Sequence, residues 1–301
     1  MKLNAEEIAS QLFENLWNDY SEKVPYAAQY AQLLSQKGRQ PVIDHISFRT
    51  INTNTGEQPG GVEAISHILD CFGYHNTGKK LCADKLVAVN SFVNSTGKLP
   101  KILVSQLEVR HLPGKIQHLV HETVADTDYL ISDKGIELLG IVREKGALPP
   151  DAARFLNADL RGYFSRPWPI PLRNVITEVF DTSAFCAWVL LHGNTVSAIS
   201  ANVNSQGVPE WRNIDETVNA LQSVAVSFQK TVVAGNGSFM QAYTPPVKIN
   251  TEVFDDDGPG FLNIEYSKFG LTERGMEERN GKMVRFDDFV FGGGIHFFDL
   301  L

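Results

Sequence analysis

Two side chains in this sequence, His45 and Arg49, have the types and spacing that could do chemistry together. They belong to segment 42–50, whose pattern predicts a short buried strand with Ile43, His45 and Ser47 on one face. An imidazole that a strand holds facing inward is a candidate metal ligand, and an arginine offers a fork of donors to a carboxylate. The alternative is a hydrogen-bonded core histidine beside a surface arginine, and this stretch alone leaves both interpretations open.

Composition places the chain among ordinary soluble proteins. It has 301 residues, 43% of them hydrophobic and 21% charged, which allows one large domain or two fused ones. The net charge of −8 and the lack of a Lys/Arg-rich block argue against a nucleic-acid partner. No run approaches 18 apolar residues and the N-terminus has no signal-peptide core, so we expect no membrane association.

The cysteines also bear on localisation. Cys71, Cys82 and Cys186 are odd in number and show no CxxC spacing. This usage favours a reducing compartment in which the thiols are small apolar fillers. We therefore predict a cytoplasmic protein.

Periodicity and punctuation residues predict a mixed set of helices and strands. Asn4 can cap a helix that ends near residue 20, and Pro25 can begin a second one that ends before Gly38. The remaining expected helices are 62–71, a long stretch 116–163, a helix that Asp181-Thr182-Ser183 caps and that runs through 191, and 214–224. The expected strands are 86–93, 101–109, 195–203, 226–233, 239–253 and 260–268.

His118, His121 and Glu122 fall in the long helical stretch. Their order is not that of a zinc protease motif, so we interpret them as a solvated helix face. The prolines in the segment Arg166-Pro167-Trp168-Pro169-Ile170-Pro171 end the stretch and mark a boundary.

The two halves of the chain echo each other. Segment 43–47 corresponds to 196–200, and segment 101–107 corresponds to 260–266, with similar offsets. A repeat of this length predicts two βαβββ-like modules, 40–112 and 169–301, that complete one another's sheet. Helices in 1–39 precede them and a helical insertion, 113–168, separates them. The predicted fold is a single α+β domain with a mixed or antiparallel sheet.

Four positions would then face a shared cavity: His45, Gln106, Ala198 and Glu265. Rigid strands that carry two histidines and one carboxylate form the facial site of non-haem Fe(II) oxygenases. This sequence supplies one histidine, one glutamine and one glutamate at these places.

The chain resembles a known family at several short motifs. They are His45-Ile46-Ser47-Phe48-Arg49-Thr50, the strand 102–107, the Arg166-Pro167-Trp168 corner and Ile264-Glu265-Tyr266. These motifs are similar to those of the former DUF1338 family, which includes the 2-oxoadipate dioxygenase/decarboxylases, or hydroxyglutarate synthases. The resemblance implies a vicinal-oxygen-chelate-like fold and an Fe(II) cofactor, with other divalent metals as alternatives. It also implies a reaction of lysine catabolism, in which a 2-oxo diacid and O2 give a 2-hydroxy diacid and CO2.

The resemblance assigns roles to three residues. His45 and Glu265 match metal ligands, and Arg49 matches the arginine that pairs with a substrate carboxylate. The second metal histidine should fall at Ala198, which offers no donor; His192 or Gln106 would have to replace it. Two alternatives therefore stay open, a ligand-binding homologue without catalysis and a metal-dependent hydrolase. The C-terminal segment 291–296, with His296, could cover the cavity or simply pack against it.

Overall fold

A computed structural model of the chain describes residues 2–56, 60–229 and 231–290. The chain divides into two compact units. The first comprises Met1–Asn18, Ser47–Val196 and Ile249–Ile264, and the second comprises Asp19–Ile46, Ser197–Lys248 and Glu265–Leu301. Several long elements therefore begin in one unit and end in the other. The module boundaries given above stay predictions, and the segment around His296 lies outside the described residues.

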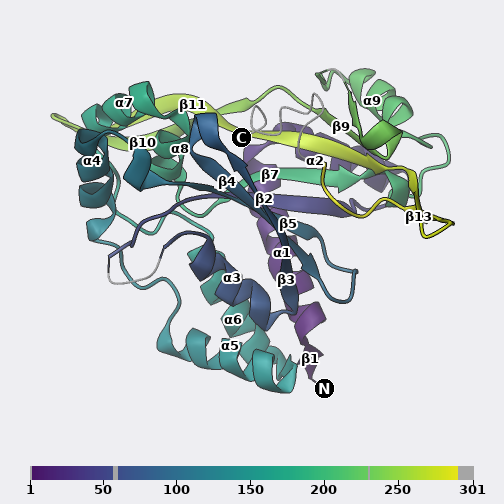
Figure 1. Ribbon diagram of the computed structural model, residues 1–301, viewed down its shortest axis with the longest axis horizontal. Helices are drawn as coiled ribbons and strands as arrows, with labels where there is room; N and C mark the ends of the chain where they lie inside the picture. Colours follow the sequence, from purple (N-terminus) through teal and green to yellow (C-terminus); the bar gives the residue numbers. More distant parts are fainter. Residues whose placement is uncertain (1, 57–59, 230, 291–301) are drawn as a thin grey trace. The chain divides into compact units, whose positions relative to one another are not determined.

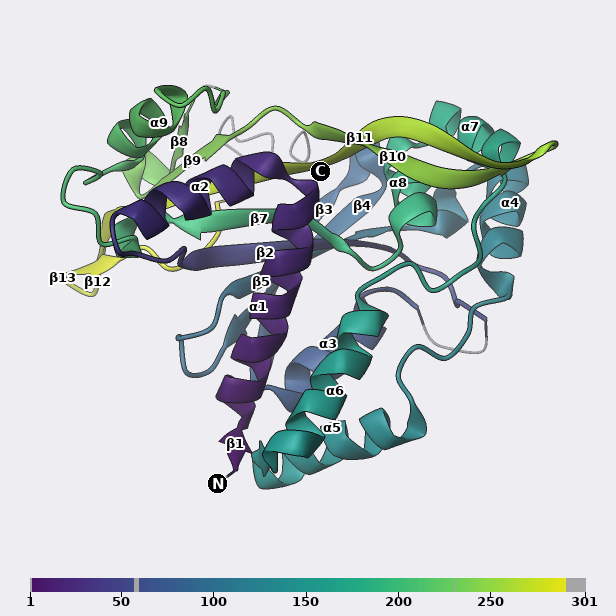
Figure 2. The ribbon, with the colours of Figure 1, turned by 180° about the vertical axis from the view of Figure 1, so that it is seen from behind.

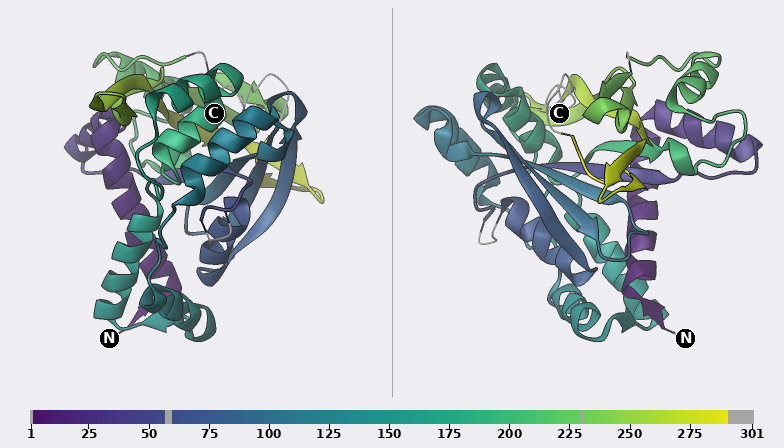
Figure 3. Two further views of the ribbon diagram at one scale, coloured as in Figure 1. Left: turned by 90° about the vertical axis from the view of Figure 1, so that its left-hand side faces the viewer. Right: turned by 45° about the vertical axis from the view of Figure 1, so that its right-hand side comes forward.

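The sheet of the first unit has the strand order β3-β4-β5-β2, and both β3–β4 and β4–β5 are antiparallel (Figure 3). Its strands are β2 (Ile43–Ile51), β3 (Tyr74–Cys82), β4 (Val87–Asn94) and β5 (Lys101–Leu107). Two short strands, β1 (Leu3–Asn4) and β6 (Ala147–Leu148), pair separately. A further ribbon joins β10 (Val247–Asp255) to β11 (Gly258–Arg274).

Two groups of helices belong to the first unit (Figure 1). One group contains α3 (Gly61–Cys71), α5 (Asp133–Lys145) and α6 (Pro150–Tyr163). The other contains α4 (Gly114–Ala125), α7 (Arg173–Thr182) and α8 (Ala184–His192). The long helix α1 (Ala5–Lys23) begins in this unit.

The second unit is built on the strand order β2-β7-β11-β9-β8 (Figure 2). β7 (Val196–Asn202) is parallel to β11, whereas β9 (Phe239–Tyr243) is antiparallel to it and β8 (Val232–Ala234) lies at the edge. The helices are α2 (Pro25–Gln36) and α9 (Ile214–Gln222), and β12 (Met276–Arg279) and β13 (Lys282–Arg285) form a hairpin. Short 3-10 turns lie at Ala83–Lys85, Val109–His111, Val203–Ser205 and Gly235–Gly237.

Several local signals act as the sequence predicts. Asn4 accepts a hydrogen bond from the backbone of Glu7 at 2.8 Å, and the Glu7 side chain accepts one from the backbone of Asn4 at 2.8 Å. This reciprocal capping box starts α1. Pro25 occupies the first turn of α2, and Ser183 caps α8 by accepting from the backbone of Cys186. The predicted starts of these helices are confirmed.

The predicted long helix 116–163 is wrong. Three separate helices, α4, α5 and α6, replace it. Ser132 caps the second of them, Gly146 ends it with φ of +69°, and Pro150 begins the third. Two elements were not predicted. They are α7, which directly follows the proline-rich corner, and β3, whose residues are mostly polar. Among the described residues, no helix combines the length and apolar composition that a bilayer crossing requires.

Candidate functional sites

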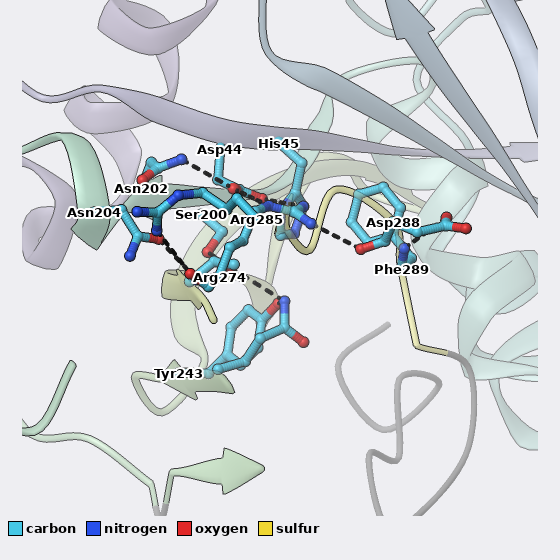
Figure 4. Close-up of polar contacts among 12 residues, drawn as sticks. Asp44, His45, Ser200, Asn202, Asn204, Tyr243, Arg274, Arg285, Asp288 and Phe289 are labelled. Carbon is cyan, nitrogen blue, oxygen red and sulfur yellow. Dashed lines mark hydrogen bonds and ion pairs between the residues drawn. The ribbon is translucent and has the colours of Figure 1, made fainter. Parts of the chain in front are cut away.

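A buried ion pair forms the centre of the second unit (Figure 4). Asp44 on β2 receives two hydrogen bonds from the guanidinium of Arg274 at the end of β11, at 2.7 and 2.8 Å. Its carboxylate also accepts a hydrogen bond from Nδ1 of His45 at 2.8 Å and one from Asn202 at 3.3 Å. The side chains of the ion pair are only 2–3% exposed. Asp44 therefore holds a cation and an imidazole at the same time.

Aromatic rings and backbone groups complete the surroundings of Arg274. Its guanidinium carbon lies 5.3 Å from the ring centroids of both Phe239 and Phe289, and the group donates to the carbonyl of Asp288 at 2.7 Å. The His45 ring meets Phe289 edge-on, with the centroids 5.3 Å apart. A guanidinium is weakly hydrated and stacks on aromatic faces, which makes arginine suited to such an interior.

Neighbouring strands add neutral polar groups to this centre. The hydroxyls of Ser200 and Thr272 lie 2.7 Å apart, and the amide of Gln241 donates to Tyr243 at 2.9 Å. Strand register explains the grouping, since β11 pairs with β7 on one side and β9 on the other. Burial raises the pKa of Tyr243, and the charge of Asp44 raises it further, so the phenol is neutral.

The pKa of Asp44 reflects a balance of opposing effects. Burial by itself would raise it, but hydrogen bonds from His45 and Arg274 and the positive charge of Arg274 hold it well below the ordinary value. Asp44 is consequently an ionised acceptor. His45 therefore donates through Nδ1–H, the arrangement that metal-bound histidines also use to fix the ring.

The other predicted metal ligands lie elsewhere on β11 and β7. Glu265 is exposed to solvent, whereas His45 is 1% exposed, and no contact joins the two among the described residues. Ala198 pairs in register with Lys268 of β11, and its methyl group offers no donor to a metal. The assignment of His45 and Glu265 as joint ligands stays a prediction.

Among the described residues, the donor set around His45 does not make up a three-ligand iron centre. The described part of the chain contains no group of three His, Cys, Asp or Glu side chains placed to hold a metal ion. Asp44 already satisfies both carboxylate oxygens with a guanidinium.

Arg49 forms a second candidate site, in the first unit. It is 9% exposed, and its guanidinium carbon lies 4.7 Å from the ring centroid of Trp188 and 5.4 Å from that of Phe185, both on α8. Its Nε is buried without a hydrogen-bond partner, and no carboxylate among the described residues forms an ion pair with it. Burial lowers the pKa of Arg49 to about 9, which still leaves it charged at neutral pH. A buried guanidinium without a carboxylate partner is a favourable binding partner for an anionic ligand.

The two possible replacements for the second histidine have other contacts. His192, 6% exposed, closes α8 and stacks at 4.8 Å on Trp188, the same ring that covers Arg49. Gln106 accepts from the backbone of Val62 at 2.8 Å and donates to Glu108 at 3.2 Å. Gln106 therefore holds the first turn of α3, and both ends of its amide have a hydrogen-bond partner.

Three residues that define these sites, Asp44, Arg274 and Trp188, were not predicted from the sequence. Asp44 directly precedes His45, and a carboxylate beside an imidazole was an available signal. Arg274 lies 230 positions from Asp44, and nothing in the sequence connects the pair. Trp188 belongs to a helix that is apolar on nearly all sides, so its sequence does not indicate which residue contacts Arg49.

Comparisons with known proteins reveal similarity at the level of structure. No protein-family model matches the sequence, and no curated protein matches it. A glyoxalase-superfamily protein from Ralstonia eutropha JMP134 superposes with a TM-score of 0.83 at 18% identity, over 91% of this chain and 84% of that one. The fold is vicinal-oxygen-chelate-like.

Two further structures connect this fold to the family that the motifs indicated. Hydroxyglutarate synthase from Oryza sativa, solved with 2-oxoadipate, has a TM-score of 0.70 at 17% identity, over 91% of this chain and 82% of that one. YdcJ from Shigella flexneri, which includes a DUF1338 domain, has a TM-score of 0.71 at 11% identity, over 92% and 70%. The resemblance inferred from the motifs is thus confirmed as a likeness of fold.

Proposed function

We propose that this protein binds a small 2-oxo diacid of the 2-oxoadipate type and that Arg49 pairs with one of its carboxylates. The buried guanidinium of Arg49 carries this proposal, because it has no carboxylate partner among the described residues. The guanidinium of Arg49 lies over the rings of Trp188 and Phe185, which hold it in place and shield it from water. The similarity of the fold to a hydroxyglutarate synthase that binds 2-oxoadipate supports the same substrate class.

Iron-dependent oxidative decarboxylation of this ligand is a second candidate. The motif at His45–Thr50 and the fold similarity favour it, and its products would be a 2-hydroxy diacid and CO2. The donors described around His45 do not fit a three-ligand iron site. Ligand binding without a metal is therefore the function that the geometry supports best.

Titration calorimetry with 2-oxoadipate, in EDTA and then anaerobically with Fe(II), separates the two candidates. We expect binding of equal affinity in both conditions and no oxygen uptake. Binding that requires Fe(II), together with 2-oxoadipate-dependent oxygen consumption, would replace the proposal by the oxygenase. Failure of the protein to bind any 2-oxo diacid in either condition would refute both.

Arg49→Gln tests the role of the arginine. Loss of a charge-assisted hydrogen bond costs about 1.5–3 kcal/mol, so we expect the Kd to rise roughly 10–150-fold. The ligand-free variant should be as stable as wild type, because it no longer buries an unpaired charge. Arg39→Gln, at an exposed arginine, is the matched control. An unchanged Kd in Arg49→Gln would exclude Arg49 from the binding site.

A further inference from the structure

A cavity lies in the first unit, between α3, α5 and the segment 127–131. Its volume is about 360 Å³, at the small end of the range of about 300–1,000 Å³ for ligand pockets. The lining is mostly apolar and includes Ile51, Ile68, Leu130, Ile131, Leu139 and Trp168. Arg49 itself does not line this cavity, although the next residues of β2, Thr50 and Ile51, do.

A glycine keeps this cavity open. Gly140 lies in the interior of α5 and lines the cavity, and a Cβ at this position would meet no atom within 4 Å. Glycine destabilises a helix interior relative to alanine. Its presence here removes a side chain that would otherwise project into the space, and the facing helix α3 contributes the small residue Ala64.

The rim of the cavity combines apolar side chains with one cation. Tyr129 is 63% exposed and Ile136 is 54% exposed, although both are large hydrophobic residues that line the cavity. Arg143, an exposed lining residue, forms no ion pair or side-chain hydrogen bond among the described residues. An apolar interior with a cationic rim matches a ligand with an alkyl chain and a single anionic head.

We propose that this cavity binds a medium-chain alkyl carboxylate, with the chain between α3 and α5 and the carboxylate at Arg143. A monocarboxylate suits this cavity better than a diacid, because most of the lining is apolar and would solvate a second carboxylate poorly. A neutral alcohol would leave Arg143 unused. The proposal does not rest on the diacid-binding function, and 2-oxoadipate should not compete for this cavity.

Fluorescence quenching of Trp168 by bromoundecanoate tests the proposal, because this ring lines the cavity. We expect saturable quenching that decanoate reverses and decanol reverses much less effectively. Gly140→Leu should abolish it by filling the cavity, whereas Gly162→Leu should not, since Gly162 lies on α6 outside the lining with open space around it. Arg143→Gln should weaken binding roughly tenfold, and Lys145→Gln on the same helix should leave it unchanged.

A measurement on the wild-type protein keeps the proposal testable if Gly140→Leu fails to fold. Cys71 lines the cavity and Cys82 does not, while both are partly exposed. Decanoate should slow alkylation of Cys71 at least tenfold and leave Cys82 unchanged. Equal protection of both thiols, an unchanged affinity in Gly140→Leu, or equal competition by decanol and decanoate would each overturn the proposal.

Discussion

Replacing Asp44 by leucine tests whether the ion pair with Arg274 organises the second unit. The variant leaves a 3%-exposed guanidinium without its counter-ion and removes both of its hydrogen bonds to Asp44. Breaking a buried pair in this way costs about 3–5 kcal/mol. Chemical denaturation should report a loss of that size in the free energy of unfolding. Arg274→Met should cost a similar amount, because it strands the carboxylate.

The double variant Asp44→Leu/Arg274→Met makes the test specific. Apolar side chains can replace a whole buried ion pair at little cost, so its stability should exceed that of either single variant. The double-mutant cycle should give a coupling energy of at least about 2 kcal/mol. Additive losses, or single variants that lose less than about 1 kcal/mol, would refute the account of the pair.

The pH dependence of stability gives an independent check of the same pair. The folded-state pKa of Asp44 lies below its unfolded value, so the folded protein binds fewer protons at this site. The contribution of Asp44 to the free energy of unfolding is fully present above about pH 4 and is lost as the pH falls toward its folded-state pKa. Asp44→Leu should therefore lose less stability than wild type between pH 4 and pH 2, measured by denaturation at each pH.

Three further predictions concern other parts of the chain. Burial raises the pKa of Cys186 to about 12 and also raises the pKa of the partly exposed Cys71, so iodoacetamide at pH 8 should label Cys82, label Cys71 slowly and leave Cys186 unlabelled in the native protein, as mass spectrometry would show. Gly193→Ala should lower the free energy of unfolding, measured by chemical denaturation, by roughly 2–4 kcal/mol, because φ of Gly193 is +65° and a Cβ would lie 2.6 Å from the carbonyl oxygen of Ser165. Gly162→Ala, at a position with open space, is the control. Asn213→Ala should lose about 1 kcal/mol by the same assay, since Asn213 caps α9 at 2.9 Å from the backbone of Glu216; a loss below a few tenths would contradict this role.

The parts of the fold that were predictable depend on local chemistry. The capping box at Asn4, the proline at the start of α2 and the cap at Ser183 act within a few residues, so the sequence reveals them. The breaks in the stretch 116–163 were missed because apolar periodicity continues through short loops. The strand β11 extends to Arg274, beyond the predicted end at 268, because its neighbours β7 and β9 supply partners that no local pattern indicates.

The candidate sites divide in the same way. Residue type and strand position were enough to select His45 and Arg49, and the structure buries both. What lies around them depends on contacts between distant segments. Trp188 stacks on Arg49 from a helix more than a hundred residues away, and Arg274 reaches Asp44 from the other end of the chain. A single sequence contains no local signature of such pairs, so the chemistry of each site followed only from the structure.

The charge balance at Asp44 explains why its carboxylate is not a free ligand for a metal ion at His45. A buried carboxylate requires a positive partner, which a bound metal supplies in many enzymes and Arg274 supplies here. A cation that took Asp44 as a ligand would displace the guanidinium and leave it unpaired between Phe239 and Phe289. The cost of stranding that charge opposes the exchange. Asp44 is therefore a partner that fixes the His45 ring rather than a metal ligand.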